Sequence, residues 1–213
     1  MSLKLYFLRH GQTPMSREDH FCGSGLDPEL TTDGAEMAAA FAEAYQTMDW
    51  AAVYSSPLRR TIATAAPLCQ ALGIEIHRRD GLAEIAYGEW EGQSKEQINA
   101  EYHDDYIRWS TDPSSYAPTG GETSVEIERR GLEVVEEIQR DHRTGNVLVV
   151  SHKATIRIIL CSLLGIDVAR FRHRLLCPVA SVSTIEFTEH GPLLHVLANR
   201  SHLNARLISL AGT

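Results

Sequence analysis

The sequence has few cysteines, no excess of positive charge and no long apolar run. Its four cysteines lie far apart and form no Cys-x-x-Cys pair, so we interpret them as free thiols of a reducing compartment. Acidic residues outnumber basic ones by 28 to 20, which gives a net charge of −8 at pH 7. An acidic surface repels phosphate backbones and anionic lipids, so neither nucleic acid nor a membrane surface is an expected partner.

Several longer patterns are missing as well. The longest apolar stretch, residues 156–164, is interrupted by Arg157, and residues 1–8 are too short for a signal peptide. We therefore expect a cytoplasmic protein. The chain has no Gly-x-x-x-x-Gly-Lys-Ser/Thr loop, no dinucleotide glycine pattern and no His-Glu-x-x-His motif. Its ten histidines show no clustered ligand spacing, so neither a metal nor a cofactor is expected.

What the chain does contain is an alternation of apolar strands and amphipathic helices. Strands are expected at residues 3–8, 51–55, 74–77 and 146–150, with a late pair at 179–187 and 193–199, and helices at 31–46, 58–72, 122–140 and 153–164. In the helix 122–140, the expected buried face carries Val125, Leu132, Val135 and Ile138. The alternation predicts an α/β protein with three layers, α/β/α, around a mostly parallel sheet.

One segment breaks this alternation. Residues 79–120 are rich in glycine and aromatic side chains and contain only short helical stretches. We interpret the segment as a small helical insertion over the ends of the strands. It belongs to a single expected domain that spans residues 1–213.

Polar residues follow the predicted strands at the point where each strand ends. Strand 3–8 is followed by Arg9-His10-Gly11, strand 146–150 by Ser151-His152, and strand 51–55 leads to Arg59-Arg60. Each feature alone also fits a solvated surface. In an open α/β sheet, however, ligands bind beyond the carboxyl ends of the strands. Because arginine offers planar paired donors to phosphate, the shared position predicts a cationic pocket for a small phosphorylated ligand.

Five blocks of sequence carry a more specific signal. They are Leu8-Arg9-His10-Gly11-Gln12-Thr13, Ser55-Ser56-Pro57-Leu58-Arg59-Arg60, Leu82-Ala83-Glu84-Ile85 with Gly88-Glu89-Trp90-Glu91-Gly92, Gly120-Gly121-Glu122-Thr123, and Val150-Ser151-His152 with Ile156-Arg157. In order and spacing they resemble the blocks of the histidine phosphatase superfamily, in its phosphoglycerate-mutase-like branch. The insertion and the ending Asn199-Arg200-Ser201-His202-Leu203 are most similar to metal-independent phosphatases of the phosphoserine type.

The resemblance implies a role for each matched residue. His10 would be the nucleophile and Glu84 the proton donor, with Glu89, Glu91 and Glu122 as competing acids. The phosphoryl oxygens would be held by Arg9, Arg60 and His152, the last also counted as catalytic. Arg59 occupies the variable position of its block.

The chain departs from the family's pattern at three places. Ser16 stands where the family often has Asn, and it is retained as a phosphate contact. Lys153-Ala154 replaces the usual Gly-Gly, and Cys22-Gly23 replaces the common Gln-Gly. Cys22, Gly23, Lys153 and His202 are therefore the candidates for contact with the organic end of the substrate.

The chemistry supports these assignments. A neutral imidazole nitrogen can attack phosphorus and form a phosphohistidine, which splits one difficult step into two. Arginines and a second, protonated histidine can stabilise the transferring group in place of a metal. A carboxylic acid must protonate the leaving alkoxide, and it can later deprotonate the attacking water.

We therefore expect a metal-independent phosphatase that acts on a small phosphorylated metabolite, with phosphoserine as the leading substrate. A cofactor-dependent phosphoglycerate mutase is one alternative, disfavoured by the short, acidic insertion. A non-catalytic phospho-ligand binding protein on the same fold is the other. The oligomeric state is open, a homodimer included.

Overall fold

The structure is a computed structural model that describes residues 2–212. Its centre is a six-stranded sheet in the order β3-β2-β4-β1-β5-β6. The strands are β1 (Leu3–Arg9), β2 (Trp50–Ser55), β3 (Ile76–Arg78), β4 (Gly145–Ser151), β5 (Val182–Thr188) and β6 (Gly191–Asn199). The first four run parallel to one another, whereas β5 is antiparallel to both β1 and β6.

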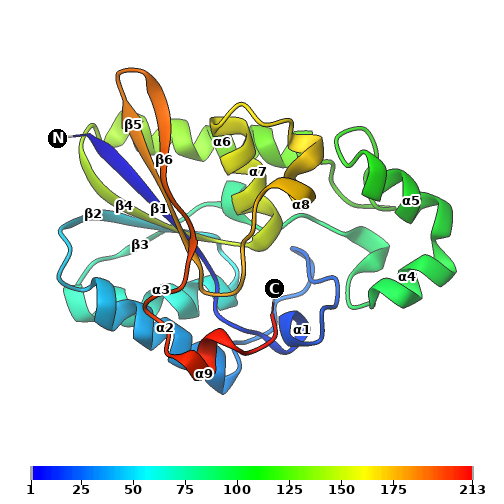
Figure 1. Cartoon of the computed structure of the whole chain (residues 1–213), viewed down its shortest axis with the longest axis horizontal. Coiled ribbons are helices and arrows are strands. Elements are labelled where there is room, and N and C mark those ends of the chain that lie inside the picture. The colour runs from blue at the N-terminus through cyan, green and yellow to red at the C-terminus, as the bar shows by residue number, and fades with distance from the viewer. Residues whose placement is uncertain (1, 213) are drawn as a thin grey trace.

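Helices cover both faces of this sheet (Figure 1). On one face lie α2 (Thr32–Tyr45) and α3 (Arg59–Leu72), and on the other α6 (Ser124–Asp141) and α7 (Lys153–Leu163). The side chains of β4 alternate between the two layers: Val147 and Val149 pack with α6 and α7, whereas Leu148 packs with α2 and α3. This explains why the strand is apolar throughout. The expected three-layer α/β/α fold is confirmed.

The buried face of α6 differs from the expected one. The helix begins at Ser124 with Thr123 as its N-cap, and Val125 is 47% exposed. Thirteen residues separate Val125 from Ile138, which at about 100° per residue places them on nearly opposite sides of the helix. The buried residues are Ser124, Ile127, Gly131, Val134, Val135 and Ile138. The prediction for Val125 is therefore wrong, whereas those for Val135 and Ile138 are confirmed.

The late strand pair starts later than expected. Ala180 has a φ of +54°, and the Ser181 backbone N–H donates to the Pro178 carbonyl in a turn. Because a left-handed residue interrupts extended backbone, β5 begins only at Val182. The two strands then pair antiparallel through the turn at Gly191, as the sequence predicts.

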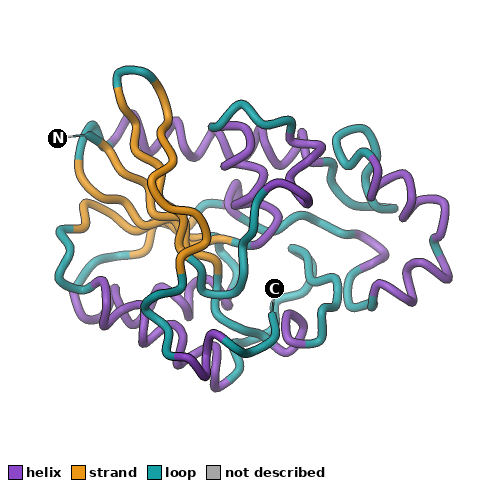
Figure 2. Tube along the Cα trace, viewed as in Figure 1, coloured by secondary structure: helices purple, strands orange, loops and turns teal. Residues whose placement is uncertain are grey.

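Short helices surround the carboxyl ends of the strands, where loops prevail (Figure 2). They are η1 (Asp80–Leu82), η2 (Gly88–Trp90), α4 (Lys95–Glu101), α5 (His103–Thr111), α1 (Pro14–Arg17), η3 (Val168–Arg170), α8 (Phe171–Arg174) and α9 (Ala205–Ile208). The insertion has a small core of its own, in which Trp90, Ile98, Tyr106 and Trp109 pack together. Over residues 2–212, none of the helices combines the length and apolarity that a bilayer crossing requires.

The buried face of α6 found in the structure can be tested by a matched pair of substitutions. Ile138→Ala removes a fully buried side chain and is expected to lower the free energy of unfolding by about 2–5 kcal/mol. Val125→Ala, on the exposed side of the same helix, is expected to change it by less than about 0.5 kcal/mol. Urea unfolding measures both, and equal losses would contradict this assignment of the buried face.

Candidate active site

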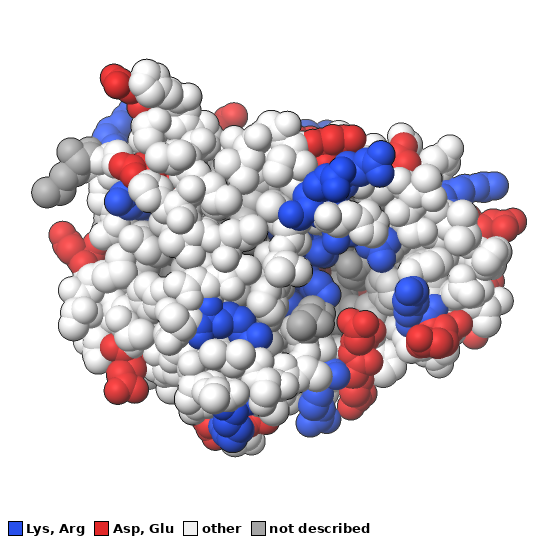
Figure 3. Space-filling model, in the orientation of Figure 1, with Lys and Arg blue, Asp and Glu red and all other residues white. Residues whose placement is uncertain are grey.

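A cavity of about 270 Å³ opens beyond the carboxyl ends of the central strands. Its lining includes Arg9, His10, Glu84, Tyr87, Lys153 and Arg157. The overall charge of the protein is negative, yet basic side chains gather around the hollow in the middle of this face (Figure 3). The local charge at the cavity therefore suits an anionic ligand.

The pairing of β1 with β4 brings the two histidines together. Arg9 is opposite Ser151, and the His10 backbone N–H donates to the Ser151 carbonyl at 3.1 Å. The ring centroids of His10 and His152 lie 5.2 Å apart. Gly11 follows because a Cβ there would stand 2.4 Å from the Gly34 carbonyl oxygen. Glycine is thus required where the chain leaves β1.

His10 is held as a neutral imidazole. Its Nδ1 lies 2.8 Å from the Gly11 carbonyl oxygen, which can only accept, so Nδ1 carries the proton. The lone pair is then on Nε2. Burial lowers the pKa of His10 well below its usual value, and the charges of Arg60 and Arg9 add to the effect. Such a nitrogen is available as a nucleophile near neutral pH.

His152 is neutral too, which differs from the protonated state expected for it. The Arg60 Nε donates to His152 Nδ1 at 3.2 Å, so the proton of the ring is on Nε2, which donates to Ser56 Oγ at 2.8 Å. Burial lowers the pKa of His152 well below its usual value, with Arg60 as the next cause. If the His152 ring were protonated, its positive charge would lie directly against the guanidinium group of Arg60.

Arg60 lies behind the cavity rather than in its lining. It is 1% exposed, and its two terminal nitrogens donate to the carbonyls of Leu26 at 2.7 Å and Gly23 at 2.9 Å. Arg59, in contrast, is exposed and pairs with acids at the surface. Arg60 also lies 3.5 Å from Asp27, so the two adjacent arginines differ in burial and not in having an acid nearby. Neither Arg60 nor His152 lines the cavity itself.

Arg9 lines the cavity and is anchored from behind. Its Nη1 donates to the carbonyls of Cys177 at 2.8 Å and Gly212 at 2.9 Å. Burial lowers the pKa of Arg9. Its Nε is buried without a hydrogen-bond partner among the described residues, which leaves a donor for a ligand.

Glu84 is positioned by the start of α7. Its carboxylate accepts from the backbone N–H groups of Ala154 at 3.3 Å and Thr155 at 3.2 Å, both in the first turn of that helix. The side chain is 5% exposed and lines the cavity. The carboxylate thereby supplies the cap that His152, at the N-cap position, does not provide.

The three competing acids are placed differently. Glu91 accepts from the backbone N–H groups of Gly25 and Tyr87, and Glu122 pairs with Arg130 at 3.0 Å. Glu89 is exposed, and none of the three lines the cavity. Of the four candidates, the structure brings only Glu84 to the pocket.

The residues at the three departures from the family's pattern, with Gly23 beside one of them, occupy two kinds of position. Ser16 and Cys22 line the cavity, but the Ser16 hydroxyl also closes the capping box of α1 with Thr13. Burial raises the pKa of the Cys22 thiol to about 11, so it stays protonated at neutral pH. Lys153 lines the cavity, and burial lowers its pKa to about 8. Gly23 reaches the site through its carbonyl, which Arg60 holds.

His202 does not reach the cavity. Its ring packs edge-on against Phe41 and Tyr45 of α2, with centroids 5.6 and 5.9 Å away. Burial lowers the pKa of His202 to about 4. The end of the chain instead approaches the site at Ala211 and Gly212, whose carbonyls accept from Gln12 and Arg9.

Sequence reasoning missed several residues of the lining. They include Asp19, Tyr87, Lys95, Trp109, Arg157 and Arg172. Arg157 stands in one of the motif blocks without an assigned role. Arg172 lies in the basic run Arg170-Phe171-Arg172-His173-Arg174, which was the available signal. Within residues 2–212, no three His, Cys, Asp or Glu side chains gather as a metal-ligand set.

Comparison with known proteins agrees with this geometry. A model of the histidine phosphatase superfamily (branch 1) matches residues 5–200. Phosphoserine phosphatase 1 of Hydrogenobacter thermophilus is 31% identical over 201 residues, which cover 94% of each chain.

Two solved structures are similar over nearly the whole chain. Bacillus stearothermophilus YhfR has a TM-score of 0.89 and 26% identity, and covers 95% of this chain and 100% of its own. A phosphoserine phosphatase mutant from Entamoeba histolytica, in complex with phosphoserine, has a TM-score of 0.83 and 25% identity over 95% and 100% of the two chains. With the motif blocks converging on one cavity and a family match along most of its length, the chain belongs to the histidine phosphatase superfamily (branch 1).

Proposed function

We propose that this phosphomonoester hydrolase works by transferring a phosphoryl group to His10 Nε2, with phosphoserine as its leading substrate. The observation that carries the proposal is the state of His10, a buried neutral imidazole whose Nδ1 proton is committed to the Gly11 carbonyl. Membership of the family and the relatives named as phosphatases support hydrolysis of phosphomonoesters as the reaction.

In the first step, the Nε2 lone pair attacks phosphorus and the bond from phosphorus to the ester oxygen breaks. Glu84 gives its proton to the departing alkoxide. In the second step, Glu84 takes a proton from water, whose oxygen attacks the phosphohistidine. The nitrogen–phosphorus bond breaks, inorganic phosphate leaves, and His10 returns to its neutral form.

The surrounding cations stabilise the charge on the phosphoryl oxygens. Arg9 contributes from the wall of the cavity, where its Nε has no partner in the described structure. Arg60 and His152 lie directly behind His10, and Arg60 Nε holds the imidazole of His152. Ser16 adds a hydroxyl at the rim. This preorganised set of donors can do electrostatically what a metal ion does in other phosphatases.

The substrate's organic end lies toward Cys22 and Lys153 in this proposal, both in the lining of the cavity. The small volume of the cavity, about 270 Å³, favours a small metabolite over a macromolecule. The phosphoserine phosphatase of Hydrogenobacter thermophilus, similar along 94% of the chain, supports phosphoserine as the first candidate. All four cysteines are free, which supports a reducing, cytoplasmic location. A homodimer stays a prediction.

The role of His10 is tested by His10→Ala. Loss of the nucleophile is expected to lower kcat by about 10³-fold or more while the fold is retained. After brief mixing with substrate, the wild-type chain is expected to carry an acid-labile, base-stable phosphate on His10. His190→Ala, at an 89% exposed site in the turn between β5 and β6, is the matched control.

Three results would count against this assignment. Near-normal activity of His10→Ala would show that His10 is not the nucleophile. A wild-type chain that binds esters without turnover would favour the binding-protein alternative. Isomerisation of 3-phosphoglycerate faster than release of phosphate would favour the mutase.

The role of Glu84 is tested by how strongly the loss of activity in a Glu84 variant depends on the leaving group of the substrate. Glu84→Gln keeps the size of the side chain but has no proton to give. Activity toward alkyl phosphates, whose leaving groups need protonation, is expected to fall by about 10²–10⁴-fold, and activity toward p-nitrophenyl phosphate much less. Glu122→Gln, which removes an acid outside the cavity, is the control. The same leaving-group dependence in the control would transfer the acid role to Glu122.

Independence from metal ions is a further expectation, because Arg9 and Arg60 supply the positive charge. Activity toward p-nitrophenyl phosphate is expected to persist after dialysis against EDTA, and added Mg²⁺ or Zn²⁺ is expected to give no increase. Loss on chelation, followed by recovery with either ion, would contradict the proposal.

A further inference from the structure

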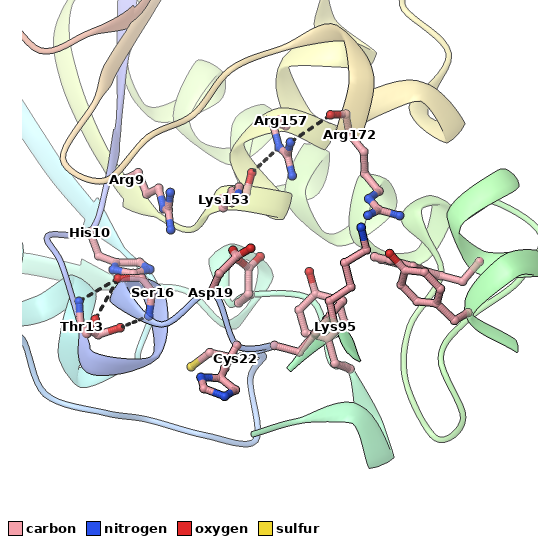
Figure 4. A pocket seen from close by; sticks show the side chains of 16 residues that line it. Arg9, His10, Thr13, Ser16, Asp19, Cys22, Lys95, Lys153, Arg157 and Arg172 are labelled. Carbon is pink, nitrogen blue, oxygen red and sulfur yellow. Dashed lines mark hydrogen bonds between the residues drawn. The ribbon is translucent and has the colours of Figure 1, made fainter. Parts of the chain in front are cut away.

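The cavity contains two arginines that the proposed reaction does not use. Arg157 of α7 and Arg172 of α8 both line it, and in Figure 4 they lie on the side of the cavity away from His10. Arg157 is 9% exposed, and Arg172 is half-buried. Among residues 2–212, no carboxylate lies within ion-pair distance of either guanidinium. Two cations are thus placed at the cavity without a counter-charge.

Both guanidinium groups are oriented by contacts other than acids. Arg157 Nε donates to the Lys153 carbonyl at 3.1 Å, and its Nη1 to the Arg172 carbonyl at 3.4 Å. The Arg172 guanidinium stacks over the Trp109 ring, with its Cζ 4.1 Å from the centroid. Its Nη1 is buried and has no hydrogen-bond partner in the described structure. Both guanidinium groups therefore have a fixed orientation, and Nη1 of Arg172 remains a donor without a hydrogen-bond partner in the described structure.

This arrangement is costly without a ligand. Burial lowers the pKa of Arg157 and the like charge of Arg172 adds to this effect, whereas Cys177, Tyr87 and Glu84 act in the opposite direction. A buried charge is normally compensated by a partner of opposite sign. The pattern seen here, fixed donors at a cavity wall with no acid beside them, suits an anion that arrives with the substrate.

The acids of the cavity lining compensate these charges only from a distance, since neither Asp19 nor Glu84 forms an ion pair with Arg157 or Arg172 in the described structure. Asp19 acts on Lys153, whose pKa it raises against the effect of burial. Glu84 is engaged by the first turn of α7 and by the proposed proton transfer. The arginines therefore form a second group of cations in the cavity, on the side away from His10 (Figure 4).

We propose that Arg157 and Arg172 bind a carboxylate of the substrate, joined to the phosphate ester by a short organic link. The two oxygens of a carboxylate match the paired donors of guanidinium, and the one cavity is small enough for a compact ester to span both subsites. This inference rests on the proposed phosphatase function and adds a substrate class to it, that of small phosphorylated carboxylic acids.

Two esters isolate the carboxylate. O-phosphoserine and O-phosphoethanolamine share the phosphate, the ester link and the ammonium, and only the first has a carboxylate. The measured quantity is the ratio of their kcat/KM values, phosphoserine over phosphoethanolamine. For the wild-type chain we expect it to be well above one. In Arg172→Gln it is expected to fall by about 10- to 100-fold, chiefly through KM for phosphoserine, since a charge-assisted hydrogen bond is lost.

Two further variants complete the experiment. Arg174→Gln removes the same charge from an exposed position on the same helix, α8, and is expected to leave the ratio as in the wild type. Arg172→Lys keeps the charge but not the planar paired donors, so an intermediate ratio is expected. Thermal unfolding checks each variant, and Arg172→Lys carries the comparison if the glutamine variant does not fold.

The outcomes separate this inference from the function on which it rests. If Arg172→Gln and Arg174→Gln give the same ratio while both esters are hydrolysed, the carboxylate subsite is refuted and the phosphatase stands. If the wild-type chain hydrolyses neither these esters nor any other phosphomonoester, the proposed function fails, and the subsite fails with it.

Discussion

β1 and β4 lie side by side in the middle of the sheet, and their register determines which residues stand next to each other at the pocket. With Arg9 opposite Ser151, the two histidines leave their strands at the same height. Parallel pairing makes this possible, because it aligns the carboxyl ends of both strands at one edge. A shift by one residue would turn alternate side chains to the other face and separate the histidine rings. The apolar residues of β4, buried by helices on both faces, hold the register in place.

The protonation states of the two histidines in this pocket follow from the burial of arginines next to their rings. Burial lowers the pKa of His10, and the charges of Arg60 and Arg9 add to the effect, which favours the unprotonated state that a nucleophile requires. The same arginine, Arg60, donates to His152 and keeps that ring neutral in the unliganded protein. An incoming phosphate dianion would reverse this balance, since its charge favours protonation of nearby groups. The ligand can therefore set the protonation of His152 that charge stabilisation in the reaction needs.

Local sequence predicts those parts of the site that depend on where strands end. Arg9 ends β1 and His10 follows it directly, and the alternation of elements places that end beside β4. The family resemblance adds Glu84, which the structure brings to the same cavity. Both the layers and the order of the major elements are also predictable, because they arise from apolar periodicity within single segments.

Other features depend on contacts between distant segments, which no local pattern contains. Arg60 donates to Gly23 and Leu26, more than 30 positions away, so its place behind the cavity follows from the loop it holds. Arg172 owes its orientation to Trp109 in the insertion. His202 is half-buried against α2, because packing on aromatic rings competes with the polar role expected of it. In each case, tertiary packing rather than local sequence propensity determines where the side chain lies.

The anchor of Arg9 has a consequence for biosynthesis. Its guanidinium is held by the Gly212 carbonyl, which lies 203 positions further along the chain. On a ribosome, β1 is made first, and the group that holds Arg9 beside His10 is made 203 positions later. The sheet also needs β4 and β5 on either side of β1 before its edges are covered. A nascent chain thus contains His10 long before the contact that orients Arg9 can form, so the pocket proposed for phosphate becomes ordered only after Gly212 has been added.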